Sequence, residues 1–90
     1  MSSEEDYQAL MTALIKKQMV MLGPNLVLLK ARGVSGLTVL DDGTVQKLSG
    51  DPGQILQELT GAFMTLSGQI AQMTLSTLLE KYPGIKPPNN

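Results

Sequence analysis

The chain has 90 residues, a formal net charge of −1, 42% hydrophobic residues, and neither His nor Cys. This length fits one domain, and the hydrophobic fraction is ordinary for a globular protein, so global disorder is not expected. The near-neutral charge, the lack of a basic block and the low aromatic content argue against a nucleic-acid partner. Without Cys or His, the chain has no thiolate chemistry, no disulfide, and neither the commonest general base nor the commonest transition-metal ligand.

The sequence starts Met-Ser-Ser-Glu-Glu-Asp, which is acidic and lacks the basic start of a signal peptide. We therefore expect a cytoplasmic protein. Residues 59–79 carry no charge and are long enough to span a bilayer. However, Gln69, Gln72 and several Thr and Ser residues form a polar stripe along this segment. A helix buried in a bundle is therefore preferred over a membrane span.

The N-terminal third of the chain predicts a helix. Two capping boxes are possible at its start, formed by Ser2 with Glu5 or by Ser3 with Asp6. Apolar residues then recur at helical spacing. Segment 18–29 carries no charge and is apolar nearly all round, which indicates neighbours on more than one side.

Gly23-Pro24 interrupts this helix, because an interior proline loses one hydrogen bond and clashes with the preceding turn. The preferred interpretation is one helix that kinks at Gly23-Pro24 and continues to about Arg32. The alternative is a break, with a second helix that starts at Pro24. Simple curvature is preferred over a functional hinge. Lys30 and Arg32 are interpreted as cations that complement the helix dipole, with anion binding as the alternative.

Residues 34–48 change to strand-like spacing. Asp42-Gly43 lies between two short β-prone runs, which is the usual signal for a β-hairpin. Asp41 and Asp42 also admit a metal site, but EF-hand spacing and a third carboxylate are missing. Turn chemistry is preferred, and we expect no metal and no cofactor. The apolar residues that flank the turn are Leu37, Val39, Val45 and Leu48.

The longest predicted element is a single helix from Asp51 to Lys81. Asp51 is its expected N-cap, Pro52 suits the first helical position, and Pro83 ends helical geometry. About thirty residues at ~1.5 Å each would make a rod of roughly 45 Å. One apolar stripe on this helix comprises Leu56, Leu59, Phe63, Leu66, Ile70 and Met73.

A second apolar row on this helix lies more than a quarter-turn away and comprises Met64, Ala71, Leu75 and Leu78. Gly61 and Gly68 lie beside it and permit close backbone approach. The first helix can cover only one row, and an isolated hairpin is marginal in water, so the second row would remain wet in a monomer. We expect a partner chain to cover it, and a charge at Ala71 to break the oligomer. The expected interface comprises Leu59, Phe63, Leu66, Ile70, Met73, Met64, Ala71, Leu75, Leu78, Gly61 and Gly68.

The predicted fold is therefore α+β and mostly helical: a helix kinked at Gly23-Pro24, a β-hairpin and a long helix. Two copies are expected to pair into a dimeric four-helix bundle. Residues 1–82 are expected to form the single domain. Residues 83–90 are proline-rich and are expected to be an extended or disordered tail.

Three functions remain compatible with the sequence. The favoured one is a small non-catalytic homo-oligomeric interaction module, such as a scaffold, adaptor or regulatory subunit, whose partner is itself or another protein. The alternative is a carrier of a lipid or other apolar small molecule between its helices. An enzyme is disfavoured, because the carboxylates lie at helix ends or in the turn and no catalytic motif occurs. The methionines are expected to fill the core, with an adaptable binding surface as the alternative.

Overall fold

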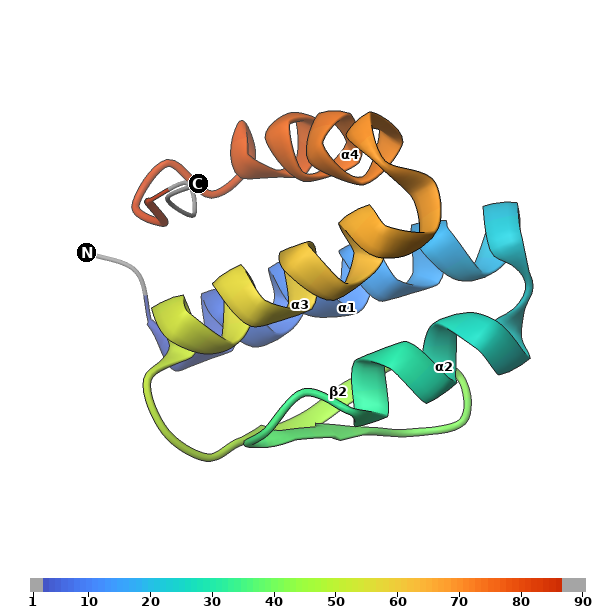
Figure 1. Cartoon of the computed structure of the whole chain (residues 1–90). Helices are drawn as coiled ribbons and strands as arrows, with labels where there is room; N and C mark the ends of the chain where they lie inside the picture. The colour runs from blue at the N-terminus through green and yellow to red at the C-terminus, as the bar shows by residue number, and fades with distance from the viewer. Residues whose placement is uncertain (1–2, 87–90) are drawn as a thin grey trace.

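The structure is a computed structural model that describes residues 3–86. Within that range the chain forms four helices and a two-stranded antiparallel sheet (Figure 1). The α+β, mostly helical class predicted from the sequence is confirmed. In chain order the elements are α1 (Glu4–Leu22), α2 (Pro24–Arg32), β1 (Leu37–Val39), β2 (Val45–Leu48), α3 (Pro52–Ser67) and α4 (Gln69–Leu79).

Local side-chain chemistry sets the starts of α1 and α3. The Ser3 hydroxyl accepts from the Asp6 N–H at 3.2 Å, and the Asp6 carboxylate accepts from the Ser3 N–H at 3.5 Å. This reciprocal pair is the second of the two predicted capping boxes. Asp51 accepts from the Gln54 N–H at 3.3 Å, as expected of an N-cap, and Pro52 opens α3.

The first break in the helical pattern falls at Gly23. Its backbone, at φ 90° and ψ 149°, is not helical, so α1 ends at Leu22 and α2 starts at Pro24. The preferred single kinked helix is therefore wrong, and the break with Pro24 at the first helical position is correct. Gly23 tolerates the positive φ that reverses the chain. Figure 1 shows α2 returning alongside α1.

The predicted single helix from Asp51 to Lys81 is also wrong, because Gly68 divides it. Gly68 adopts φ 59° and ψ −131°, so α3 ends at Ser67 and α4 begins at Gln69. In Figure 1, α4 folds back across α3 and α1 instead of extending the rod. The row that was expected to stay wet comprises Met64, Ala71, Leu75 and Leu78. The chain itself thereby buries the last three of these, and Met64 is half-buried.

The hairpin is confirmed, and its turn rests on α1. The Gly43 N–H donates to the Leu40 carbonyl oxygen at 2.9 Å, and Gly43 takes a φ of 91°. A Cβ at this glycine would come within 2.7 Å of the Met19 sulfur, so the turn lies against the helix. The Val45 N–H donates to the Thr12 hydroxyl at 2.9 Å and ties β2 to α1. The four apolar residues that flank the turn, Leu37, Val39, Val45 and Leu48, are all buried.

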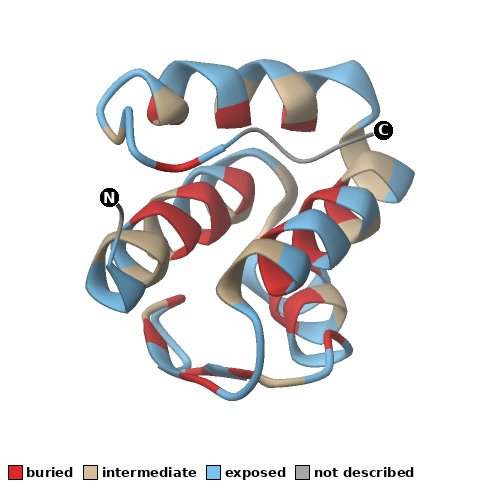
Figure 2. Cartoon of the chain, turned by 90° about the vertical axis from the view of Figure 1, so that its left-hand side faces the viewer, coloured by how far each residue is buried: buried red, intermediate tan, exposed pale blue. Residues whose placement is uncertain are grey.

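Helices α1 and α3 run in the same direction and form the centre of the fold (Figure 1). Helix α4 covers one side of this pair, and α2 with the hairpin covers the other. Figure 2 shows the buried faces of all these elements turned toward one shared core. The structure contains one chain, so it does not test the dimeric four-helix bundle, which stays a prediction. The largest fully buried side chains include Phe63, Leu10, Met11, Leu14, Ile15, Leu56 and Leu59.

The segment after α4 adds one residue to the core. Ile85 is 3% exposed, and its N–H donates to the Tyr82 carbonyl oxygen at 2.9 Å. The extended or disordered tail was predicted for residues 83–90. Residues 83–86 lie in the described range and contain turns, whereas residues 87–90 lie outside it.

Candidate interaction surface

The expected interface residues fall into two groups in the structure. Five of them, Leu59, Phe63, Ala71, Leu75 and Leu78, are buried by their own chain. Among the others, Ile70 is 52% exposed and Met73 is 67% exposed on the outer face of α4. Because Ala71 is fully buried, a charge there disrupts the fold itself and does not report on association. The remaining four are Met64 and Leu66, which are half-buried, and Gly61 and Gly68, which are exposed.

A larger set of outward apolar side chains lies on the α1–α2 helical hairpin. Val20 is 88% exposed and Leu29 is 70% exposed, and Met21 and Leu26 are 47% and 44% exposed. On α2, Leu26 and Leu29 are three residues apart, on the face opposite the buried Val27, Leu28 and Ala31. We call Val20, Met21, Leu26 and Leu29 the α1–α2 surface.

The residues of the α1–α2 surface are not among those expected from the sequence to form the interface, although the sequence carries a signal for them. The uncharged segment 18–29 is apolar nearly all round, which indicated buried neighbours on more than one side. In the fold, α1 and α2 pack against each other and against the centre, and each leaves one apolar face in solvent. The apolar side chains of this segment that do not fit into the core are therefore exposed to solvent.

A shallow apolar groove adjoins the α1–α2 surface through their shared Val20. It lies between α1 and the hairpin turn and has a volume of about 330 Å³. Its position follows from the close packing of Gly43 on α1. The groove is open to solvent and has one cation and one anion at its edge. The residues that line it are Lys16, Met19, Val20, Pro24 and Asp42.

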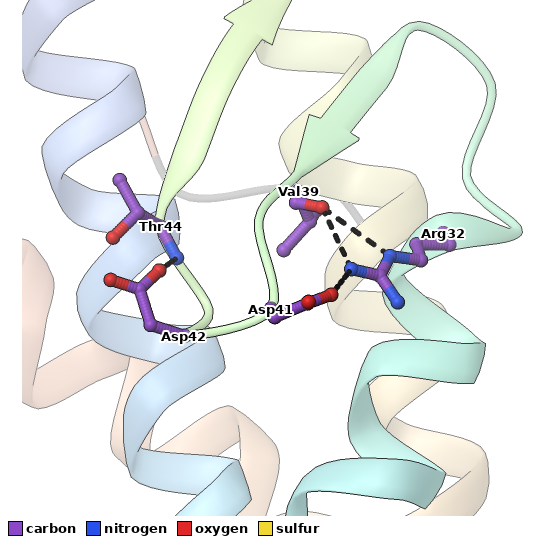
Figure 3. Close-up of polar contacts among 5 residues, drawn as sticks. All are labelled: Arg32, Val39, Asp41, Asp42 and Thr44. Carbon is purple, nitrogen blue, oxygen red and sulfur yellow. Dashed lines mark hydrogen bonds and ion pairs between the residues drawn. The ribbon is translucent and has the colours of Figure 1, made fainter.

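An arginine anchors the hairpin to the end of α2 (Figure 3). Arg32 donates to the Val39 carbonyl oxygen from Nε at 3.3 Å and from Nη2 at 3.1 Å. The same Nη2 donates to the Asp41 carboxylate at 2.8 Å. This geometry gives Arg32 a hydrogen-bonding role in addition to complementing the helix dipole. It also orients the turn that forms one wall of the apolar groove.

Asp42 stabilises the turn from within. Its carboxylate accepts from the Thr44 N–H at 2.9 Å (Figure 3). This backbone hydrogen bond, together with one from the Thr44 hydroxyl and the charge of Lys16, lowers the pKa of Asp42 below its ordinary value. Asp41 and Asp42, the two metal candidates, thus have protein partners. Within residues 3–86, no three His, Cys, Asp or Glu side chains are grouped to hold a metal ion.

A more polar depression lies on the other side of α2, where the α2–β1 loop meets α3. Two adjoining hollows of about 400 Å³ and 260 Å³ share Ser35 and Glu58. Lys30 lines the first hollow, and Asp51 lines the second. Both hollows are open to solvent and are lined mainly by polar residues at helix ends and in loops.

No helix in the described part of the chain is both long enough and apolar enough to cross a membrane. No protein-family model matches the sequence, and neither the curated proteins nor the solved structures yielded a significant match. The surface of this chain is therefore the only guide to its function. Its most distinctive feature is the concentration of exposed apolar side chains on the α1–α2 hairpin.

Proposed function

We propose that the protein is a small, non-catalytic, homo-oligomeric interaction module in which the α1–α2 surface is the contact. The observation that carries this proposal is the exposure of Val20 (88%) and Leu29 (70%), which lie on two adjacent helices. Singly exposed apolar residues are normal, whereas a group of them on one helical hairpin is typical of an interaction site.

A second copy of the chain fits this surface chemically. Segment 18–29 carries no charge, and the nearest cations, Lys17 and Lys30, flank it, so two copies can meet through apolar side chains with the charges at the rim of the contact. The net charge of −1 produces little repulsion between copies. In a two-fold contact, each apolar patch covers the identical patch on its partner, which requires no second type of surface.

Association would add to a fold that is already complete. The accessible surface is 5198 Å², close to the roughly 5,100 Å² expected of a compact monomer of this mass. One chain therefore buries as much surface as a folded monomer of its size does. Variants on the α1–α2 surface are consequently expected to change association without unfolding the chain.

The test is light scattering coupled to size-exclusion chromatography across the micromolar range. Leu29→Lys and Val20→Lys place charges on the α1–α2 surface, and each should weaken self-association at least about tenfold. Ser76→Lys is the matched control, because Ser76 is an exposed polar residue of α4. Circular dichroism checks that all three variants fold. A wild-type monomer at every concentration, or equal association of Leu29→Lys and Ser76→Lys, would contradict the proposal.

The apolar groove supports a second candidate function, the carriage of an apolar small molecule. Its volume of about 330 Å³ lies at the lower end of the range for small-molecule sites. Met19, Val20 and Pro24 supply an apolar lining, and the charges of Lys16 and Asp42 oppose each other beside it. Native mass spectrometry of protein purified without detergent should then show a bound ligand that Met19→Glu removes. A wild-type spectrum with the bare chain alone would speak against this function.

A further inference from the structure

A single glycine separates α3 from α4. Gly68 adopts φ 59° and ψ −131°, a backbone conformation that L-amino acids with a side chain rarely adopt. A Cβ at Gly68 would meet no atom within 4 Å, so the backbone angle alone favours glycine here. The first turn of α4 has no side-chain cap. The break therefore depends on one residue and not on a loop with its own hydrogen bonds.

The apolar pattern continues through this break as if the helix were straight. The stripe of Leu56, Leu59, Phe63 and Leu66 on α3 continues at steps of three and four residues across Gly68 into α4. A straight helix would also align Ile70 and Met73, now half or more exposed, with Leu59 and Leu66. In a straight helix the buried row of α4, which comprises Ala71, Leu75 and Leu78, would lie more than a quarter-turn from that stripe. The first stripe therefore fits a straight helix, whereas burial of the α4 row requires either the break at Gly68 or a second chain.

A straight helix cannot stay within one copy of this fold. Residues 52–79 at ~1.5 Å each would form a rod of about 42 Å, whereas the longest extent of the molecule is 33 Å. Straightening therefore carries α4 away from the α1–α3 pair that it covers (Figure 1). Both the uncovered pair and the buried face of α4 would then face solvent. An identical α4 from a second copy fits the vacated position.

We propose that Gly68 is a hinge through which two copies of the chain exchange α4, each with α3 and α4 joined into one helix. The partner is a second copy, since its α4 reproduces the contacts that this chain makes with its own α4. The exchange uses the buried face of α4 and does not depend on the α1–α2 surface. It is therefore independent of the proposed function.

The residues beneath the hinge favour its opening. Gln18 of α1 is fully buried, and its Oε1 accepts from the Ser67 hydroxyl at 3.0 Å. Its Nε2 is buried without a hydrogen-bond partner. A buried amide donor without a partner destabilises the closed monomer, and it becomes hydrated while the hinge is open, before a second α4 covers it. The closed form thus has an unpaired donor and a glycine-only backbone angle at the same place.

The first experiment compares Gly68→Ala with Gly61→Ala by light scattering. Alanine at position 68 opposes the positive φ of the closed form and favours a straight helix. Each exchanged dimer contains two hinges, so its association constant should rise about a hundredfold or more. Gly61 is exposed within α3, has no positive φ and has nothing within 4 Å of a Cβ, so its replacement should leave the constant nearly unchanged.

The second experiment measures whether α3 and α4 become one helix. The sequence has no Cys, so Glu58→Cys with Ser76→Cys gives two unique exposed sites for spin labels. A straight helix would separate their Cα atoms by about 27 Å. Because α4 packs back on α3 in the closed form, the expected distance there is shorter. Mixing with excess unlabelled chain isolates the distance within one chain. The Gly68→Ala dimer should show the long distance.

A third variant keeps the proposal testable if Gly68→Ala folds poorly. Insertion of Gly-Ser-Gly after Gly68 relaxes the hinge and should favour the closed monomer. A Gly68→Ala chain that stays monomeric, or a dimer that retains the short distance, would overturn the hinge. Dimerisation through the α1–α2 surface is a separate result, because Leu29→Lys would abolish it and leave the exchanged dimer intact.

Discussion

The hydroxyl of Ser67, the last residue of α3, donates to Oε1 of Gln18 on α1 at 3.0 Å. Gln18 is 0% exposed and lies at the C-terminal end of the otherwise apolar buried face of α1. Ser67 also donates to the Phe63 carbonyl oxygen at 3.3 Å, whereas Nε2 of Gln18 has no partner. The amide is therefore only half satisfied.

Replacement of Gln18 by Met should stabilise the fold. Met has a similar shape and removes the unpaired donor, whose burial costs about 1–3 kcal/mol, at the loss of one hydrogen bond worth about 1 kcal/mol. We expect the free energy of unfolding to rise by about 1 kcal/mol in urea denaturation. Ser67→Ala leaves the whole Gln18 amide unpaired and should lower the free energy of unfolding by about 1–2 kcal/mol. A less stable Gln18→Met chain would mean that the amide has an unrecognised partner.

Gly36→Ala should be among the most damaging single substitutions outside the core. Gly36 takes a φ of 85°, and its carbonyl oxygen accepts from the Ser49 N–H at 2.7 Å. A Cβ here would overlap the Ser49 carbonyl oxygen, which is backbone and cannot move aside. Strain and overlap together should lower the free energy of unfolding by about 3 kcal/mol or more. Thermal and urea melts measure the loss.

Gly53→Ala is the matched control for that substitution. Gly53 lies in the first turn of α3, without a positive φ, and the nearest atoms to a Cβ are 3.8 Å away. Alanine there should raise the free energy of unfolding by about 0.5–1 kcal/mol. If both alanine variants gave equal losses, the requirement for glycine at position 36 would not be conformational.

We expect Arg32 to stabilise the fold more through its hydrogen bonds to the Val39 carbonyl oxygen than through its ion pair with Asp41. The Asp41 side chain is 99% exposed, and such surface pairs contribute about 0–1 kcal/mol. Arg32→Ala removes the bonds to both partners and should cost about 1–1.5 kcal/mol. Asp41→Asn should cost less than about 0.5 kcal/mol in the same denaturation series. Equal losses would assign the whole effect to the ion pair.

Asp42 should give the hairpin a pH-dependent contribution to stability. The Thr44 N–H first, and then the Thr44 hydroxyl, lower the folded-state pKa of this carboxyl below its unfolded value. The contribution is therefore present above the unfolded pKa and is lost as the pH falls through the folded pKa. Carbon-detected NMR titration of the carboxyl should show the lowered pKa, and Thr44→Val should shift it back part of the way.

Asp42→Asn is the companion variant for this prediction. Asparagine can still accept from the Thr44 N–H and stays compatible with the turn, but it does not titrate. The difference in melting temperature between wild type and Asp42→Asn should therefore narrow as the pH is lowered. A difference that stays constant across the acidic range would contradict the role of the Asp42 carboxylate.

Several local features were predictable because neighbouring residues decide them. Asp51 and Pro52 start α3 through a side-chain cap and a proline that has no N–H to satisfy. Asp42 and Gly43 form the predicted turn through a short side-chain bond and a positive φ. Each of these features depends on interactions within a few residues of sequence.

The α1–α2 surface shows why the candidate site was not predictable in the same way. Helical spacing identifies which residues of segment 18–29 share a face, but the segment is apolar on several faces. Only the packing of α1 and α2 on their neighbours decides that Val20 and Leu29 point to solvent while Val27 is buried. The role of these exposed residues as a contact remains our proposal.

By itself, the sequence determined the helical and strand segments, the capped starts of α1 and α3, and the hairpin turn. Tertiary structure decided the two chain reversals at Gly23 and Gly68, and with them which apolar row is covered by the chain itself. The physical reason is that helical periodicity is unchanged by a break after a glycine. A straight and a folded-back helix satisfy the same local pattern, and only long-range burial against α1 distinguishes them.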